Sequence, residues 1–213
     1  MFDNIEIEQQ VAEFLLQIKA IKLQPNNPFT WASGWKSPIY CDNRITLSHP
    51  TIRTYIRQQL TQLIQEVFGP VGCIAGVATA GIPQGVLVAQ ELGLPFIYVR
   101  SKPKDHGTGN LIEGDVVTGK RVVVVEDLIS TGKSSLQAVE ALREAGYDVA
   151  GLVAIFNYGF DVAADNFKQA NCPFKTLSNY SALLKYAGEN QYITTGEVEI
   201  LKQWREDPAA WGR

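Results

Sequence analysis

Two acidic residues and a run of small hydroxyl residues stand side by side in the segment RVVVVEDLISTGKSS, residues 121–135. Adjacent carboxylates such as Glu126 and Asp127 accept hydrogen bonds from hydroxyl groups. A turn of small residues that opens a helix offers backbone N–H groups, and the positive end of the helix dipole, to a phosphate. A sugar phosphate carries both a diol and a phosphate, so one such ligand would satisfy both halves of the segment.

Two other interpretations of this segment have to be weighed. Gly132, Lys133 and Ser134 match the end of a nucleotide-binding P-loop, G-x-x-x-x-G-K-[ST], but the glycine required five residues earlier is Asp127. We therefore exclude a P-loop. The plainer alternative is a helix that starts after a strand, with Glu126 and Asp127 merely solvated.

A second polar segment, YVRSKPKDHGTGNLIEG at residues 98–114, is basic and rich in glycine. Its cationic or titratable side chains are Arg100, Lys102, Lys104 and His106. A cationic lid of this kind suits a departing pyrophosphate, whose charge grows as its bond to carbon breaks. Taken alone, such a segment is more typical of a solvated surface loop, and its place one strand before the acidic pair favours the lid.

The order of apolar segments indicates how these residues are held. Strands are predicted at 73–77, 95–99, 122–125 and 149–156, and helices near 84–92 and at about 132–145. Apolar strands that alternate with helices indicate a parallel sheet covered on both faces. Ligands of such sheets bind outside the carboxyl ends of the strands, and we expect Glu126 and Asp127 to emerge there.

The remaining segments frame this sheet. We predict a helix at about 5–21 and a second helix from Pro50 to Phe68, separated by a Pro-, Gly- and aromatic-rich stretch of short strands or a hairpin. Two or three helical segments follow Asn157, the last near 197–206. We predict one domain over residues 1–213.

Bulk properties exclude several classes of protein. The net charge of −3 over 213 residues gives no general reason to bind nucleic acid, and no apolar run is long enough to span a membrane. The first residues lack the features of a signal peptide. Cys41, Cys73 and Cys172 are scattered and odd in number, so we expect reduced thiols in the cytoplasm. The two histidines, with these cysteines, make a zinc site implausible.

The segment VVVVEDLISTGKSS resembles the phosphoribosyl pyrophosphate (PRPP) motif of type I phosphoribosyltransferases. In that family the two acids hold the ribose 2′ and 3′ hydroxyls and the loop holds the 5′-phosphate. The resemblance implies an α/β fold with a central, mostly parallel sheet flanked by helices and a small N-terminal hood. It assigns PRPP binding in this segment to Glu126, Asp127, Leu128, Ile129, Ser130, Thr131, Gly132, Lys133 and Ser134.

The stretch RSKPKDHGTGN is similar to the flexible catalytic loop of the orotate phosphoribosyltransferase family. There an arginine, a lysine and a histidine reach the pyrophosphate, and the loop closes over the partner subunit's site. The resemblance therefore implies a homodimer, and it assigns PRPP binding to Arg100, Lys104 and His106. A family lysine next to the arginine is Ser101 here, and whether Lys102 replaces it stays open.

Two further segments match the same family. FTWASGWKSPIYCDNR, residues 29–44, looks like its hood, which covers the pyrimidine and here lies mainly within about 22–47. The stretch after the first sheet strand resembles the pyrophosphate loop, with Thr79, Ala80 and Gly81 close to the ligand. The glycines could otherwise serve only a tight turn.

The chain also departs from some family members. Ala32 stands where they have a hood lysine, Thr79-Ala80 replaces a Tyr-Lys pair, and Asn157-Tyr158 replaces an arginine that holds the orotate carboxylate. The cationic partner of that carboxylate is therefore unassigned. Our hypothesis is that Lys36 or Arg44 supplies it, while Ser130 contacts the base.

The resemblance implies that orotate and PRPP give orotidine 5′-monophosphate and pyrophosphate, in pyrimidine biosynthesis. Mg²⁺ would enter on PRPP without a direct protein ligand. Lys104, His106 and Asp127 would be the catalytic residues, acting by position and charge because no nucleophile is needed. The alternatives are a PRPP-binding regulator without turnover and a phosphoribosyltransferase for another base.

Overall fold

In the computed structural model, which describes residues 4–31, 34–102 and 111–212, a six-stranded sheet forms the centre of the molecule. Its strand order is β10-β9-β8-β5-β6-β7, and every neighbouring pair is parallel except β6 and β7. The predicted α/β class and the mostly parallel sheet are confirmed. The strands are β5 (Cys73–Val77), β6 (Phe96–Val99), β7 (Ile112–Glu113), β8 (Arg121–Ile129), β9 (Asp148–Asn157) and β10 (Phe174–Asn179).

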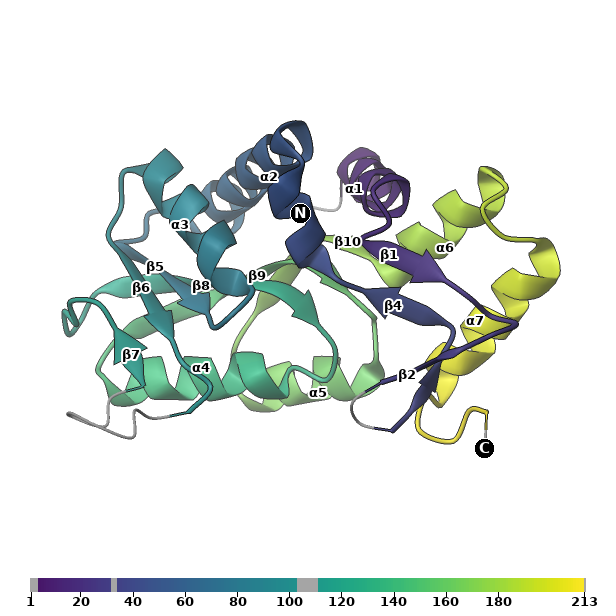
Figure 1. Cartoon of the computed structure of the whole chain (residues 1–213). Coiled ribbons are helices and arrows are strands. Elements are labelled where there is room, and N and C mark those ends of the chain that lie inside the picture. Colours follow the sequence, from purple (N-terminus) through teal and green to yellow (C-terminus); the bar gives the residue numbers. More distant parts are fainter. Residues whose placement is uncertain (1–3, 32–33, 103–110, 213) are drawn as a thin grey trace.

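Helices cover both faces of this sheet (Figure 1). On one face lie α1 (Ile5–Gln17), α2 (Pro50–Phe68) and α3 (Gly81–Leu92), and on the other lie α4 (Lys133–Glu144) and α5 (Asp161–Gln169). Alternate residues of β8 enter different cores: Val123 and Val125 join the core that contains α1 and α2, whereas Val122 and Val124 join the core that contains α4. This double burial explains the unbroken valine run.

The N-terminal hood consists of two small antiparallel pairs beside the sheet (Figure 1). Strand β1 (Ile21–Leu23) pairs with β4 (Ile39–Cys41), and β2 (Phe29–Thr30) pairs with β3 (Lys36–Ser37). The 3-10 helix η1 (Asn43–Ser48) leads from β4 into α2. The expectation of short strands or a hairpin in this stretch is confirmed.

Several predicted boundaries were wrong. The first helix ends at Gln17 instead of about residue 21, because the backbone turns at Lys19 with φ of 57° and the chain continues into β1. Helix α3 begins earlier than predicted, at Gly81. Strands β7 and β10 were not predicted, because β7 has two residues and β10, FKTLSN, is half polar. Among the described residues, no helix is both long and apolar enough to cross a membrane.

The C-terminal helices hold the hood against the sheet through a cluster of aromatic rings. Trp204 of α7 (Thr195–Glu206), which follows α6 (Tyr180–Glu189), is fully buried. Its ring lies 5.5 Å from the ring of the hood residue Trp31 and 5.9 Å from that of Tyr158, which follows β9. Its Nε1 donates a hydrogen bond to the carbonyl oxygen of Lys36 at 3.1 Å. The hood is thus attached to the body through α7.

Removal of the Trp204 ring should destabilise the fold strongly. We expect Trp204→Ala to lower the free energy of unfolding by about 3–5 kcal/mol, because a large buried ring leaves a cavity and an unpaired carbonyl. Urea unfolding followed by circular dichroism measures the loss. Trp211→Ala, at a partly buried tryptophan of the same chain, is the control and should lose clearly less. Equal losses in the two variants would contradict the anchoring role of Trp204.

Candidate active site

The acidic pair lies where β8 continues beyond the end of its pairing with β5. Strand β5 pairs with β8 only as far as Val125, whereas β9 accompanies β8 to Ile129. Glu126 and Asp127 therefore lie within the last part of β8, instead of just beyond a strand that ends at Val125 as we predicted. The strand continues because β9 still offers hydrogen-bond partners. The acids lie on the part of β8 that no longer pairs with β5.

Glu126 is buried and hydrogen-bonded. Only 5% of its surface is exposed. Its Oε1 accepts from the main-chain N–H of Asp127 at 3.0 Å, and its Oε2 accepts from Ser135 Oγ at 3.3 Å. Burial and then the neighbouring charge of Asp127 raise the pKa of Glu126 well above its ordinary value. The carboxyl of Glu126 therefore holds a proton more readily than a solvated glutamate.

Asp127 is the more accessible of the two acids. Burial raises the pKa of Asp127, and the charge of Arg44 in the hood acts in the opposite direction. Arg44 is itself bonded to Asp42, with Nε to Oδ1 at 2.7 Å, and its side chain is 62% exposed. The predicted base residue Arg44 thus lies near the predicted ribose residue Asp127, although it already has an acidic partner.

The predicted phosphate loop lines a cavity of about 320 Å³. All of Ser130 to Ser134 take part, together with Leu128, Ser135 and Gln137. Gly132 precedes α4 with φ of 78°, and no side chain caps this helix, so its first N–H groups stay available for an anion. Helix α5 supports the loop from behind, because Asn166 Nδ2 donates to the Thr131 carbonyl at 3.0 Å. The geometry suits a phosphate.

The predicted pyrophosphate loop, Thr79 to Gly81, lies against the acidic end of β8. A Cβ atom at Gly81 would come within 2.5 Å of the carbonyl oxygen of Val125, so only glycine permits this approach. The peptide bond between Ala78 and Thr79 is cis. Helix α3 begins at Gly81 without a side-chain cap. Two uncapped helix N-termini therefore lie on either side of the carboxylates.

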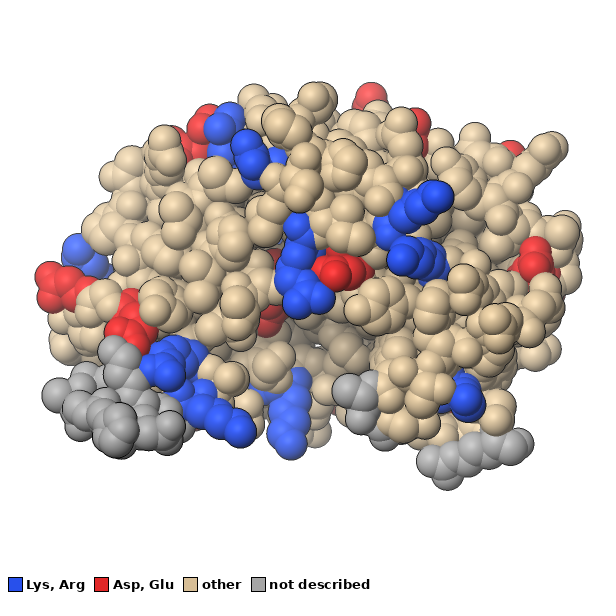
Figure 2. All heavy atoms as spheres, viewed as in Figure 1, with Lys and Arg blue, Asp and Glu red and all other residues tan. Residues whose placement is uncertain are grey.

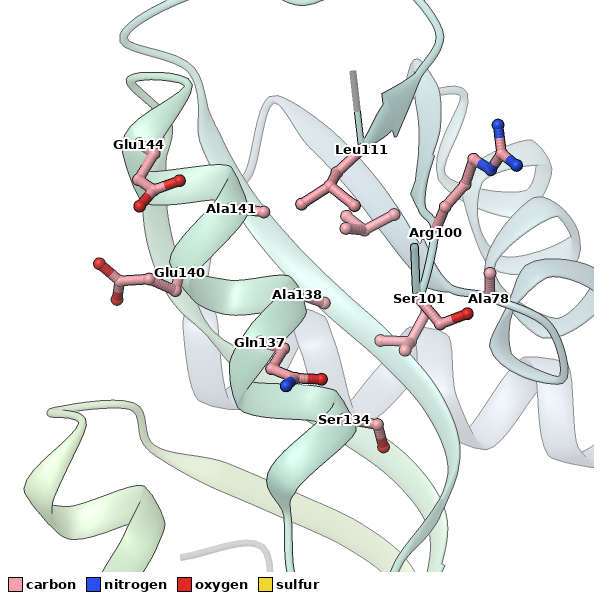
Figure 3. A pocket seen from close by; sticks show the side chains of 12 residues that line it. Ala78, Arg100, Ser101, Leu111, Ser134, Gln137, Ala138, Glu140, Ala141 and Glu144 are labelled. Atoms are coloured by element: carbon pink, nitrogen blue, oxygen red, sulfur yellow. The ribbon is translucent and has the colours of Figure 1, made fainter. Parts of the chain in front are cut away.

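A second cavity, of about 310 Å³, lies between α4 and the ends of β5 and β6 (Figure 3). Ser134 and Gln137 border both cavities. Arg100 lines this second cavity, but its guanidinium points away from α4 and pairs with Glu113 of β7, Nη1 to Oε1 at 3.4 Å. The predicted Lys104 and His106 lie outside the described residues.

Basic side chains gather around the rim of a hollow on this face of the molecule (Figure 2). The hollow lies between the body of the sheet and the hood. Lysine and arginine at such a rim favour an anionic ligand, and a hollow focuses their field. Among the described residues, no group of three or more His, Cys, Asp and Glu side chains could hold a metal ion.

The predicted base residues are only partly brought together. Lys36 Nζ donates to the hydroxyl of Thr30, its neighbour across the β2–β3 pair, at 2.9 Å. Ser130 borders the phosphate-loop cavity. Sequence reasoning did not find Ser135, which bonds Glu126, or Asn166, which bonds the loop, because a single Ser or Asn carries no distinctive spacing.

Comparisons with known proteins agree with this geometry. Residues 46–182 match the model of the phosphoribosyl transferase domain. An orotate phosphoribosyltransferase of Phocaeicola vulgatus is 59% identical over 205 residues, which cover 96% of this chain and 97% of that protein. The chain belongs to the orotate phosphoribosyltransferase family. The family's enzyme from Listeria innocua is 54% identical over 98% of this chain and 100% of its own length.

Solved structures of this family share the fold. The crystal structure of orotate phosphoribosyltransferase from Aeropyrum pernix superposes with a TM-score of 0.74 and 27% identity, over 86% of this chain and 99% of that one. The type I phosphoribosyltransferase fold is therefore confirmed.

The buried Glu126 makes the stability of this family member depend on pH. Above the ordinary pKa of a glutamate, about 4.3, the unfolded chain loses a proton that folded Glu126 retains, because its folded pKa is raised. The stabilisation is complete below that ordinary value and decreases as the pH rises through the folded pKa. Glu126→Gln cannot ionise, so its melting temperature should gain on the wild type as the pH rises from 5 to 8.

Melting temperatures measured by calorimetry across that range decide this prediction. Glu140→Gln, at an exposed glutamate of α4, is the control and should keep a constant difference from the wild type. A pH-independent difference for Glu126→Gln as well would show that Glu126 is already ionised in the folded protein.

Proposed function

We propose that the chain catalyses transfer of the 5-phosphoribosyl group from PRPP to orotate, which gives orotidine 5′-monophosphate and pyrophosphate in pyrimidine biosynthesis. One observation carries the proposal: the carboxylates of β8 adjoin the uncapped phosphate loop, linked to the start of α4 by the hydrogen bond from Ser135 to Glu126, in a chain whose orotate phosphoribosyltransferase relatives match it over nearly its whole length. The proposed reaction is attack of pyrimidine N1 on the anomeric carbon, while the bond to pyrophosphate breaks.

The ribose 5-phosphate part of PRPP is proposed to be held at two groups, its 5′-phosphate and its ribose hydroxyls. Ser130 to Ser134 supply N–H and hydroxyl donors to the 5′-phosphate, supported by the cavity that they line and by the free start of α4. Asp127 is our main acceptor for the ribose hydroxyls, because it is more exposed than Glu126. Glu126 then acts on the main chain of the site, because its carboxylate accepts a hydrogen bond from the N–H of Asp127.

Charge stabilisation of the departing pyrophosphate is assigned to the pyrophosphate loop and the basic segment. The start of α3 at Gly81 supports binding of an anion, and Arg100 stands at the end of the adjacent strand β6. Arg100 would exchange Glu113 for the diphosphate when PRPP binds. Lys104 and His106 complete this set by resemblance to the family, Lys104 as a charge and His106 as a donor to the leaving group.

Mg²⁺ is proposed to accompany PRPP. Mg²⁺ prefers substrate phosphates and retained waters and takes few protein carboxylates. A site with two adjacent carboxylates suits such an ion. When bound, it supplies charge neutralisation at the diphosphate. Asp127 is assigned to the ribose hydroxyls, and we assign Mg²⁺ no direct protein ligand.

The base is proposed to lie under the hood, against Ser130. Lys36 and Arg44 remain the candidates for the cation that faces the orotate carboxylate. Arg44, although paired with Asp42, is favoured because its charge also acts on Asp127. We further propose a cytoplasmic homodimer with a shared basic segment, on the resemblance of residues 98–114 and on three cysteines without a disulfide. No nucleic acid or membrane partner is proposed.

The decisive assay is loss of orotate absorbance in the presence of PRPP and Mg²⁺. We expect turnover with orotate and none with uracil, hypoxanthine or xanthine under the same conditions. PRPP binding without consumption of any base would support the regulator alternative, and turnover of another base would support a different specificity.

Asp127→Asn tests the ribose assignment. The variant should raise the KM for PRPP and lower turnover by about a hundredfold or more, because a charged hydrogen-bond acceptor at the reacting sugar is lost. Asp148→Asn, at an exposed position near the opposite end of the sheet, is the control and should leave both constants unchanged. Wild-type kinetics in Asp127→Asn would refute the assignment.

Lys104→Ala tests the leaving-group assignment. We expect turnover to fall by about a hundredfold to a thousandfold, as for loss of one preorganised donor to a developing charge. Lys102→Ala is measured beside it, and the ratio of the two turnover numbers shows which lysine acts on the pyrophosphate. Near wild-type turnover in Lys104→Ala would assign that role elsewhere.

A further inference from the structure

Asn43 is a buried polar residue at the junction of the hood with the sheet, and the proposed reaction gives it no role. Its exposed fraction is 1%, and it begins η1, separated from the end of β4 by one residue. A buried side-chain amide is stable only where its donors and acceptor find partners. The partners of Asn43 belong to each of the three parts of the site.

The first partner is the main chain of the ribose-binding acid. Asn43 Nδ2 donates to the carbonyl oxygen of Asp127 at 2.7 Å. A carbonyl can only accept, so this contact also fixes which way the amide of Asn43 is turned. The N–H of Asp127 is held by Glu126 Oε1 at 3.0 Å. The main-chain N–H and carbonyl of Asp127 are thus both hydrogen-bonded to side chains. Asp127 lies beyond Val125, the last residue of β8 that pairs with β5.

The second partner belongs to the hood. Cys41 Sγ, at the end of β4, donates to Asn43 Oδ1 at 3.3 Å. Burial raises the pKa of the Cys41 thiol well above its ordinary value, so the thiol keeps the proton that it donates. The amide of Asn43 is therefore engaged on both sides, by the hood and by β8.

The third connection reaches the helix that begins with the pyrophosphate loop. Thr46 Oγ1 donates to the carbonyl oxygen of Asn43 at 2.6 Å and accepts from Gln84 Nε2 at 3.2 Å. Thr46 and Gln84 are 0% and 1% exposed. Gln84 lies in the first turn of α3, which starts at Gly81. One buried network thus joins the parts proposed to hold the base, the ribose and the pyrophosphate.

We propose that Asn43 is a positioning residue that fixes the carboxylate of Asp127 relative to the hood and to the pyrophosphate loop. The proposal rests on the proposed function, and it adds a residue that does not touch the substrate. Hydrogen bonds in a buried network are strengthened by the low local dielectric, and each one restricts the geometry of the next. The neighbouring pair of Arg44 and Asp42 cannot do the same, since Arg44 is largely exposed.

The test compares two variants of Asn43 in the full-length protein. Asn43→Asp keeps the shape and removes the donor to Asp127, and Asn43→Ala removes the whole amide. We expect the KM for PRPP to rise by about tenfold or more and kcat to fall, because a displaced group at a reacting centre is costly, while the KM for orotate changes less. Calorimetric titration of PRPP with Mg²⁺ should show a matching rise in Kd.

Two further variants separate positioning from stability. Ser37→Ala removes another buried hood side chain, whose Oγ donates to the carbonyl of Ile39 at 2.8 Å and accepts from the N–H of Ile39 at 3.3 Å, both within the hood. It should lower the melting temperature and leave the KM for PRPP unchanged. Thr46→Val keeps Asn43 and cuts its connection to α3, so it should raise the KM for PRPP by a smaller factor. Thr46→Val decides the question if the Asn43 variants do not fold.

The outcomes distinguish the proposals from each other. Lower melting temperatures with unchanged KM and Kd for PRPP, in the Asn43 variants or in Thr46→Val, overturn the positioning role. A wild-type protein that binds PRPP but consumes no orotate overturns the proposed function alone. In that case the Kd for PRPP still decides the role of Asn43.

Discussion

The site depends on a single mismatch in strand length. Strand β9 pairs with β8 to its end at Ile129. Strand β5 pairs with β8 only as far as Val125, and the chain after β5 leads into α3. Inside a parallel sheet, two adjacent carboxylates would be intolerable, because both faces are covered. Past the end of the pairing with β5, the same residues keep their ladder with β9 on one side and have no strand beside them on the other. The loop that follows β5 must be small at Gly81, because it passes within contact of β8.

This arrangement resolves the apparent conflict between an acidic pair and an anion-binding loop. The acids do not face the loop as a uniform negative surface, because Glu126 is buried, bonded to Ser135 and inclined to keep a proton. Asp127 is only partly buried and is the more accessible of the two acids. On either side, the uncapped starts of α3 and α4 supply partial positive charge. A ligand with hydroxyls in the middle and phosphates at both ends matches this order of charges.

The sequence predicted those features that depend on local patterns, and it failed where long-range partners decide. The valine run and the strand–helix alternation located the sheet correctly, and the structure places the acids and the Gly-containing loop together at the end of β8. The extension of β8 through Glu126 was missed, because it requires β9 as a neighbour and no single segment records that. Asn43 was missed for a related reason: it lies 84 positions before its partner Asp127. A buried asparagine looks, in sequence, like one in a turn.

The attachment of the hood has a consequence for recognition of the base. On one side the hood is held by the polar network of Asn43, and on the other by the packing of Trp31 against Trp204 and Tyr158. A segment held at two separate places by such different interactions behaves as a fixed wall, since release of one side leaves the other in place. The space beneath it is then set by the body of the protein. The C-terminal helix α7, remote in sequence from the hood, is therefore part of what determines the shape of the proposed base site.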